Sequence, residues 1–370
     1  MPRGGVTAVR VELRVCLVAP SGRKPGGQSV QAANLVGWLR ASGRVETVCV
    51  ATDLALPGIL RPLDRLPGVR TAVRHALLAW VLVRTARRCD VIHVFAAGYW
   101  SFLLSAGIAV AAGRIVGRPV IVNYHSGEAP DHLARWPRSV RWVLQRAALL
   151  VVPSDFLARV FAQYGYTARV IRNGVDAARF LWRARGAPYR RLLCTRHFEQ
   201  NYDVGTALRA FARIRRQRPD ARLTLVGGGS EEARLRQLRD ELGLGDAVMF
   251  AGRAAPGEIH RYYDEHDVYL NSSIVDNQPL SILEAMAAGL VVVTTAAGGI
   301  TDLIEDGRTG RLAPPGSAEA LADAAVAVME DEAGFGALAR AAREQTALHD
   351  PRRVAGAWAA AYREVAERGA

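Results

Sequence analysis

The stretch VYLNSSIVDNQPLSILEAMAAGLVVVTTAAGG, residues 268–299, contains a strand, a helix and a second strand in succession. The helix is predicted over 280–288, where Leu283, Met286 and Ala287 form an apolar stripe. The flanking runs have strand composition and end in small or polar residues. A unit of this kind is the repeat of a parallel sheet that is covered by helices.

The same alternation runs through the rest of the chain. Strands are predicted first at RVCLVAP, ETVCVATD, DVIHVFAA, RPVIVNYHSG, LLVVPS and ARVIRNGVD, with helices between them. The pattern breaks at WRARGAP and restarts with RRLLCTRHF, ARLTLVGGGS and AVMFAGR. We therefore expect an α/β fold of two doubly wound, Rossmann-like domains that face a cleft, with ligands at the carboxyl ends of the strands.

The composition is that of a globular chain, because 50% of the 370 residues are apolar and 22% are charged. Chains with so large an apolar fraction are not predominantly disordered. Four scattered cysteines without a CxxC pair indicate buried free thiols in a reducing compartment: Cys16, Cys49, Cys89 and Cys194. The apolar run 15–20 is shorter than the core of a secretory signal. We expect a cytoplasmic protein.

Residues 91–113 raise the question of a membrane span, because His93 is their only group that titrates near neutral pH and their length is sufficient. The alternative is a buried strand, a turn at Gly98 and an apolar helix. We favour this alternative because a further strand, RPVIVNYHSG, follows directly and completes a β-α-β unit.

The net charge of +13 lies in the first half: residues 1–180 hold 24 Lys and Arg against 9 Asp and Glu, whereas residues 181–370 hold 24 against 26. Arginine-rich composition is one explanation, and an anionic partner is the other. Two basic stretches with tryptophans, around Trp80 and around Trp136 and Trp142, suit an anionic membrane surface, and a solvated arginine face is the alternative. We expect peripheral association with the inner membrane face and, without a recognised module, no nucleic-acid binding.

The start of the helix over 280–288 is a candidate anion site. Asn277 is predicted to cap this helix, with Pro279 in its first turn. The free N–H groups near Leu280 and Ser281 would then face a polar loop. Carboxylates before the helix and one turn inside it suit a nucleotide-sugar, although a capped core helix with a solvated glutamate has the same spacing.

These two carboxylates are Asp276 and Glu284, the second of which lies within LEAMAAG, and AGG and EDGRTG follow in order. The pattern resembles the Glu-x7-Glu signature of retaining glycosyltransferase family 4, whose members have the GT-B fold. Further segments are similar to the family at GGQSVQAANLVGWLRASG, VIRNGVDAARF and ARLTLVGGGSEEARLRQL. The resemblance implies an acceptor-side domain over 1–183, completed by a C-terminal helix over 351–370 that crosses back, and a nucleotide-sugar-binding domain over 184–350.

The resemblance also implies roles for individual residues. Arg196 and the N–H groups of Leu280 and Ser281 would stabilise the leaving diphosphate, without a metal ion. Glu284 would bind the nucleotide ribose, and Asp276 would lie near the donor sugar. A surface ion pair is the alternative for Arg196. The implied donor is a nucleotide-diphosphate sugar, with UDP or GDP expected, and the acceptor is a glycan, a lipid-linked sugar or a small molecule.

Six further positions match the family. In the first domain, His125 would face the sugar, although a histidine after a strand is often structural. Asn173, in the NGVD segment, would contribute to binding of the donor. Gly26 and Gly27 would let the backbone approach the phosphates. In the second domain the nucleotide base would be held by Gly252 and Arg253.

Two departures from the family pattern leave a second function open. Asn201 stands where the family usually has a lysine, followed by Tyr202 where glycine is common, and Asp276 is one methylene shorter than glutamate. Arg23 or Lys24 are candidates to supply the missing cation. A catalytically silent relative that binds nucleotide or glycan as a partner subunit is the alternative. A nicotinamide-dependent oxidoreductase is discounted, because GGGSEE lacks the third glycine of that fingerprint.

Overall fold

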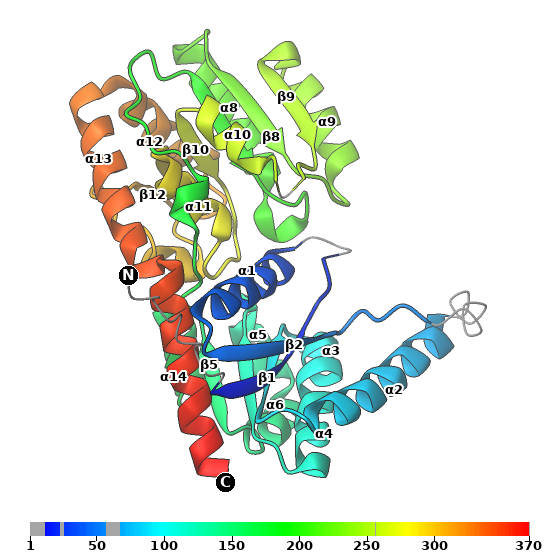
Figure 1. Ribbon diagram of the computed structural model, residues 1–370. Helices are drawn as coiled ribbons and strands as arrows, with labels where there is room; N and C mark the ends of the chain where they lie inside the picture. The colour runs from blue at the N-terminus through cyan, green and yellow to red at the C-terminus, as the bar shows by residue number, and fades with distance from the viewer. Residues whose placement is uncertain (1–11, 23–25, 57–66, 256, 370) are drawn as a thin grey trace, which may run out of the picture. The chain divides into compact units, whose positions relative to one another are not determined.

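The computed structural model describes residues 12–22, 26–56, 67–255 and 257–369. The chain forms two compact units, Met1–Gly174 with Pro351–Ala370 and Val175–Asp350 (Figure 1). Each unit contains one six-stranded sheet in which all paired strands are parallel and helices connect them. The predicted α/β fold with two doubly wound sheets is confirmed. The division between units falls at Gly174, before the expected position at 183.

The sheet of the first unit has the strand order β2-β1-β3-β4-β5-β6. Its strands are β1 (Leu13–Ala19), β2 (Val45–Ala51), β3 (Val91–Ala96), β4 (Val120–Tyr124), β5 (Leu149–Val152) and β6 (Arg169–Val170). Its helices are α1 (Gly27–Ser42), α2 (Pro67–Ala86), α3 (Tyr99–Phe102), α4 (Ile108–Val116), α5 (Ala129–Arg135), α6 (Pro137–Leu144), α7 (Asp155–Gln163) and α14 (Pro351–Gly369).

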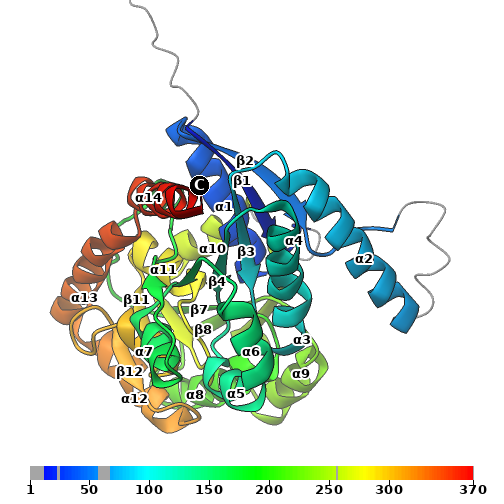
Figure 2. The same ribbon diagram turned by 90° about the horizontal axis from the view of Figure 1, so that it is seen from below.

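Helices cover both faces of this sheet. Figure 2 shows α1 and α14 on one side of the strands and α2 and α4 on the other. Helix α14 lies on the sheet because Val354, Trp358, Tyr362 and Val365 recur at helical spacing and are all buried in the core with α1. The C-terminal residues therefore complete the first core although they follow the second unit in the sequence.

The segment Tyr99–Val116 is helical throughout and includes one π-helical turn, Leu103–Gly107. By length and composition alone this segment would suffice to cross a membrane, yet 44% of its 18 residues are buried inside the protein. Ala106, Ala109 and Val110 are wholly buried in the core with α2 and β3. The β-α-β unit expected around this segment is confirmed, because β3 and β4 pair on either side of it.

The sheet of the second unit has the order β12-β11-β10-β7-β8-β9. Its strands are β7 (Arg191–Thr195), β8 (Arg222–Val226), β9 (Val248–Gly252), β10 (Val268–Asn271), β11 (Val291–Thr295) and β12 (Arg311–Ala313). Its helices are α8 (Val204–Gln217), α9 (Glu232–Glu241), α10 (Ile259–Glu265), α11 (Leu280–Ala288), α12 (Ala318–Glu330) and α13 (Glu332–Gln345).

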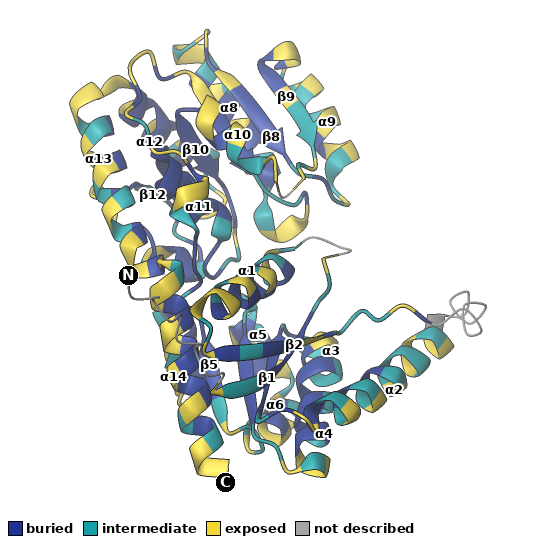
Figure 3. Ribbon diagram, viewed as in Figure 1, coloured by how far each residue is buried: buried dark blue, intermediate teal, exposed yellow. Residues whose placement is uncertain are grey.

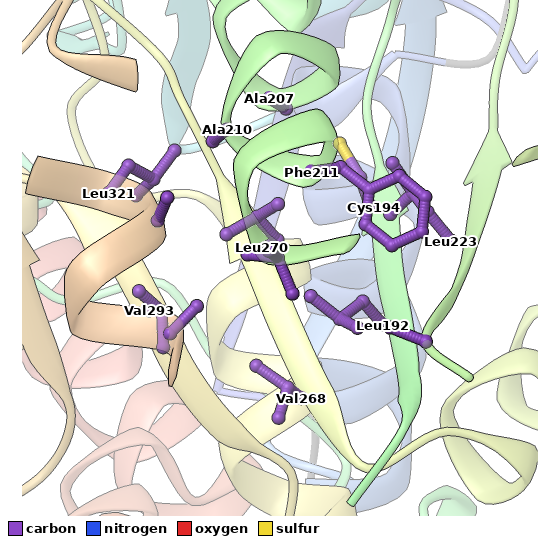
Figure 4. Packing of buried hydrophobic residues seen from close by; sticks show 14 of the residues in the cluster. Leu192, Cys194, Ala207, Ala210, Phe211, Leu223, Val268, Leu270, Val293 and Leu321 are labelled. Carbon is purple, nitrogen blue, oxygen red and sulfur yellow. The ribbon is translucent and has the colours of Figure 1, made fainter. Parts of the chain in front are cut away.

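The central strands of the second unit are buried on both faces, and all residues of β10 and β11 are buried, whereas β9 and β12 are partly exposed (Figure 3). On one face, Phe211 of α8 and Leu321 of α12 pack over Leu192 and Leu270 (Figure 4). These four side chains have 0% exposure, so truncating Phe211 to alanine would cost about 3–5 kcal/mol. This packing holds the strand ends, and the loops that follow them, in place.

Two expectations about local structure are wrong. Cys49 is exposed and lies on β2, an edge strand of the sheet, whereas the other three cysteines are buried and all four are free. Asn277 does not cap α11: the N-cap residue is Pro279, and no side chain caps the helix. Arg23 and Lys24 lie outside the described residues.

Candidate active site

The candidate residues of the second unit lie at the carboxyl edge of its sheet. Arg196 follows β7, and its N–H donates to the carbonyl of Val226 at the end of β8 (3.0 Å). The N–H of Gly227 in turn donates to the carbonyl of Gly252 at the end of β9 (2.8 Å). Three parallel strands therefore deliver their loops to one edge, where α/β proteins bind ligands.

Arg196 is held by three neighbours. Its Nε donates to Asn271 Oδ1 (2.8 Å), and a terminal nitrogen contacts Asp276 Oδ2 (2.6 Å). The guanidinium also lies over the ring of Tyr202, 5.1 Å from its centroid. The side chains of the ion pair are only 9% and 13% exposed, so Arg196 is a fixed and permanently charged group rather than a surface cation.

The glycine loop after β8 is packed against the loop that carries Arg196. Gly227 has φ +157°, and a Cβ there would lie 1.8 Å from the carbonyl oxygen of Arg196, so only glycine fits. A Cβ at Gly228 would meet Nε of Arg253 at 3.1 Å. Arg253 itself is exposed and follows Gly252. Arg196, Gly252 and Arg253 are thus brought together around this loop.

Helix α11 begins beside Asp276. The carbonyl of Pro279 accepts from the N–H groups of Ile282 and Leu283, and the N-cap residue offers no side-chain hydrogen bond to the first turn, which starts with Leu280 and Ser281. Unsatisfied N–H groups at a helix start favour an anion. Among the described residues, the buried Ser281 Oγ also has no hydrogen-bond partner. The first turn of α11 can therefore donate several hydrogen bonds to a ligand.

Glu284 is half-buried one turn into α11. Its Oε2 accepts from the Tyr263 hydroxyl (2.8 Å), which also contacts Thr195 Oγ1 (2.8 Å). Burial raises the pKa of Glu284 to about 7, although the Tyr263 hydrogen bond and the charges of Arg179 and Arg196 oppose this rise. Near neutral pH the carboxyl group thus exists in both protonation states.

The first unit brings His125 and Asn173 together. Both line a small cavity, about large enough for one water molecule, with Gln31, Asn123 and Trp38. His125 follows β4 and stacks on Phe95, with ring centroids 5.1 Å apart. Burial lowers the pKa of His125 to about 4, so its ring is neutral at physiological pH.

Gly26 and Gly27 lie at the start of α1 in the same unit. Gly26 is extended (φ −149°), and its N–H and carbonyl both pair with Ser29 Oγ (2.9 Å each). A Cβ at either glycine would meet no atom within 4 Å. Neither backbone conformation nor packing demands glycine there, which leaves the helix start open to a ligand. Neither glycine lines the cavity of His125 and Asn173.

Family models match both halves of the chain. One described as Glycosyl transferases group 1 matches residues 185–347, and one described as Glycosyltransferase Family 4 matches residues 25–179. Glycogen synthase of Mycobacterium tuberculosis is 31% identical over 291 residues, which are 74% of this chain and 69% of that relative. The chain belongs to glycosyltransferase family 4.

This glycosyltransferase is also 28% identical over 284 residues to sulfoquinovosyl transferase SQD2 of Arabidopsis thaliana, covering 70% of the chain and 54% of that relative. It is 31% identical to amylovoran biosynthesis glycosyltransferase AmsK of Erwinia amylovora over 206 residues, which cover 54% of the chain and 49% of that relative. The chain thus spans about half the length of these two relatives.

Solved structures share its fold. Anabaena HepE in complex with UDP-glucose superposes with a TM-score of 0.75 at 21% identity, covering 95% of this chain and 100% of that chain. Sucrose-phosphate synthase from Thermosynechococcus elongatus superposes with a TM-score of 0.76 at 22% identity, covering 95% and 99%. The glycosyltransferase therefore has the two-domain α/β architecture expected of GT-B enzymes.

Sequence reasoning missed several side chains around the donor-side residues. Tyr263 comes from α10 and Asn271 from the end of β10, and no motif links either residue to its partner. His197 directly follows Arg196, and its pKa is lowered by burial and by the positive charge of Arg253. His197 could have been predicted at this sheet edge from the sequence, because it directly follows the arginine of the family motif.

Proposed function

We propose that this glycosyltransferase moves a sugar from a nucleoside-diphosphate donor to an acceptor hydroxyl, with retention of configuration. The observation that carries the proposal is the convergence of Arg196, the uncapped start of α11 and Glu284 at one sheet edge. A fixed cation and free N–H groups suit a diphosphate, and a carboxylate one turn away suits the hydroxyls of a ribose. Family membership supports the same reaction.

In this reaction the bond between C1 of the sugar and the β-phosphate oxygen breaks, a bond from C1 to the acceptor oxygen forms, and the proton of the acceptor hydroxyl passes to the departing phosphate oxygen. Negative charge grows on the departing diphosphate. Arg196 and the N–H groups of Leu280 and Ser281 would stabilise that charge without moving, since packing already fixes them. Gly252 and Arg253 would border the base, and Asp276 the donor sugar.

The second unit would then be the nucleotide-sugar-binding domain and the first unit the acceptor-side domain, where His125 would face the sugar, and Asn173, Gly26 and Gly27 would contribute to donor binding. UDP is the nucleotide we propose, because the HepE structures contain UDP or UDP-glucose. GDP is the alternative. The acceptor would be a glycan, a lipid-linked sugar or a small molecule.

The nucleotide is identified by thermal stabilisation with UDP, GDP, ADP, dTDP and their common sugars. A shift with one nucleotide that is lost in Glu284→Gln supports the proposal. Absence of any shift would favour the silent-partner alternative, for which Asn201 in place of a lysine is the specific observation. If UDP binds, hydrolysis of UDP-sugars and an acceptor screen follow.

We also propose that the first unit docks on an anionic membrane surface, so that a cytoplasmic enzyme reaches a lipid-linked acceptor. Trp80 on α2 and Trp142 on α6 are 57% and 40% exposed. Their rings lie under Arg84 and Arg146, at 4.8 and 5.0 Å. Exposed tryptophan beside arginine suits the headgroup region of a bilayer.

Co-sedimentation tests the docking proposal. The protein should pellet with vesicles that contain phosphatidylglycerol at low salt and stay in solution with phosphatidylcholine vesicles. The double variant Trp80→Ser/Trp142→Ser should lose binding, whereas Trp182→Ser, an exposed tryptophan of the second unit, should not. Equal binding by both variants would refute docking through α2 and α6.

A further inference from the structure

Four rings stack in a row across one face of the first sheet. Trp358 of α14 lies 4.1 Å from His93 of β3, His93 lies 4.9 Å from Phe95, and Phe95 lies 5.1 Å from His125. The first two pairs are inclined by 21° and 14°, so the rings are nearly parallel. The row connects the C-terminal helix to the histidine at the sheet edge.

His93 is fixed through both ring nitrogens. Its Nδ1 pairs with the Tyr362 hydroxyl (2.7 Å) and its Nε2 with the Asn123 amide (3.1 Å). The ring is fully buried, which lowers the pKa of His93 well below its ordinary value and keeps the ring neutral. The Asn123 amide nitrogen can only donate, so Nε2 of the neutral imidazole accepts and Nδ1–H donates to the Tyr362 hydroxyl oxygen. The ring plane is therefore held from two sides.

His125 has no comparable support of its own. Its Nε2 is buried and has no hydrogen-bond partner among the described residues. Its backbone N–H donates to the Ala96 carbonyl (2.9 Å), which fixes the main chain but not the ring. The His125 ring stacks on Phe95, so the orientation of the His125 ring depends on the other three rings of the row.

A polar residue is costly at the centre of this core. The neighbours of His93 on β3 are Ile92 and Val94, and all six residues of the strand are buried. An aliphatic side chain would pack there without needing two hydrogen bonds to offset its desolvation. Replacing His93 by an aliphatic residue would remove the two hydrogen bonds that fix the orientation of its ring.

We propose that His93, Trp358 and Tyr362 are positioning residues that orient His125, so that α14 belongs to the active-site machinery as well as to the core. The inference rests on the proposed function for the part that His125 plays in transfer. The arrangement itself lies wholly within the first unit. Changes on α14 should therefore alter the His125 environment while leaving the donor-side residues of the second unit unchanged.

The test uses two substitutions of graded severity, one conservative substitution and a matched control. Tyr362→Phe keeps the ring and removes the hydroxyl at His93 Nδ1, and Trp358→Leu removes the first ring of the row. Trp358→Phe restores a ring. Val365→Ala is the control, because Val365 is buried in the same core on the same helix, two helical turns beyond Trp358, and contributes no ring to the row.

The first readout is the pH titration of the His125 imidazole by NMR, assigned with His125→Gln. Trp358→Leu should raise the pKa of His125 by about one unit toward its ordinary value as the ring becomes hydrated. Tyr362→Phe should shift it less in the same direction, and Trp358→Phe should return it. Val365→Ala should lower the melting temperature without moving this titration.

The second readout is kinetic. Trp358→Leu should lower kcat on the order of tenfold, because a misplaced group loses orientation, while the dissociation constant of UDP stays within twofold. An unchanged His125 titration in both Trp358→Leu and Tyr362→Phe, or an equal shift in Val365→Ala, would overturn the proposal. The titration needs no turnover, so a wild-type protein that neither binds nucleotide nor transfers sugar refutes the proposed function separately.

Discussion

The carboxylate of Asp276 lies 2.6 Å from the guanidinium of Arg196, and both side chains are largely buried. The cation that would receive the leaving diphosphate is thus already neutralised in the unliganded protein. A diphosphate at this edge must compete with Asp276 or share Arg196 with it. Release of Asp276 by the donor would in turn free its carboxylate for the hydroxyls of the sugar.

Asp276→Asn should separate these two effects. The amide preserves the size of the side chain but not its charge, so the unliganded variant retains a buried arginine without a counter-charge. Breaking such a pair costs about 3–5 kcal/mol, part of which a diphosphate recovers on binding. We expect a lower melting temperature, a larger stabilisation by UDP than in the wild type, and a kcat reduced at least about tenfold. Weaker UDP binding, measured by calorimetry, would show that the pair does not oppose the diphosphate.

Glu284 should make nucleotide binding depend on pH. Burial raises its pKa to about 7, and ribose hydroxyls donate best to the ionised carboxylate. At pH 6 about one tenth of the groups is ionised, so UDP should bind several-fold to tenfold more weakly than at pH 8, with proton uptake by the buffer on binding. Glu284→Gln should bind weakly at both values, and a wild-type affinity that is flat from pH 6 to 8 would contradict this role.

The same group should affect stability in a defined direction. The pKa of Glu284 is higher in the folded chain, about 7, than its ordinary value of 4.5. Between these values the folded state binds more protons than the unfolded state, so this contribution to stability falls as pH rises. Chemical denaturation should show Glu284→Gln more stable than the wild type at pH 8, with the difference shrinking toward pH 5. A constant difference would mean that Glu284 does not titrate in this range.

Gly227→Ala should disturb the donor-side loops through sterics. A Cβ at this position would lie 1.8 Å from the Arg196 carbonyl oxygen, and φ +157° is itself strained for alanine. Strain of this kind costs about 1–3 kcal/mol before the clash is relieved, so we expect a destabilisation above that range and loss of UDP binding. Gly356→Ala on α14, where a Cβ meets no atom within 4 Å, should instead be neutral or stabilising. Similar melting temperatures for the two variants would contradict the packing described here.

The hydrophobic periodicity of the sequence and its motifs were sufficient to predict both sheets. Buried parallel strands that alternate with amphipathic helices produce a clear alternation of apolar and polar residues in the sequence. Asp276 and Glu284 were selected from their spacing around one helix, and Arg196 was selected from its match to the family pattern. The hydroxyl that binds Glu284 could not be found, because Tyr263 comes from a neighbouring helix, α10, that lies about twenty residues earlier in the chain. The prediction for Asn277 was wrong because a proline can serve as N-cap with its carbonyl alone. Cys49 lies on an edge strand, and strand order is not visible in local composition.

Asn201→Lys tests whether the departure from the family pattern limits this enzyme. Residue 201 is exposed and lies in the loop between Arg196 and α8, and its carbonyl accepts from the N–H groups of Ile274 and Val275 just before Asp276. A lysine there keeps those backbone bonds and adds a cation beside the proposed diphosphate position. A partly screened charge of this kind is worth about 1 kcal/mol, so UDP should bind roughly fivefold more tightly at low salt, and the gain should shrink at high salt. Asn201→Gln controls for side-chain length. An affinity that is unchanged at low salt would mean that the existing residues already satisfy the phosphates, and that Asn201 does not make this glycosyltransferase a silent relative.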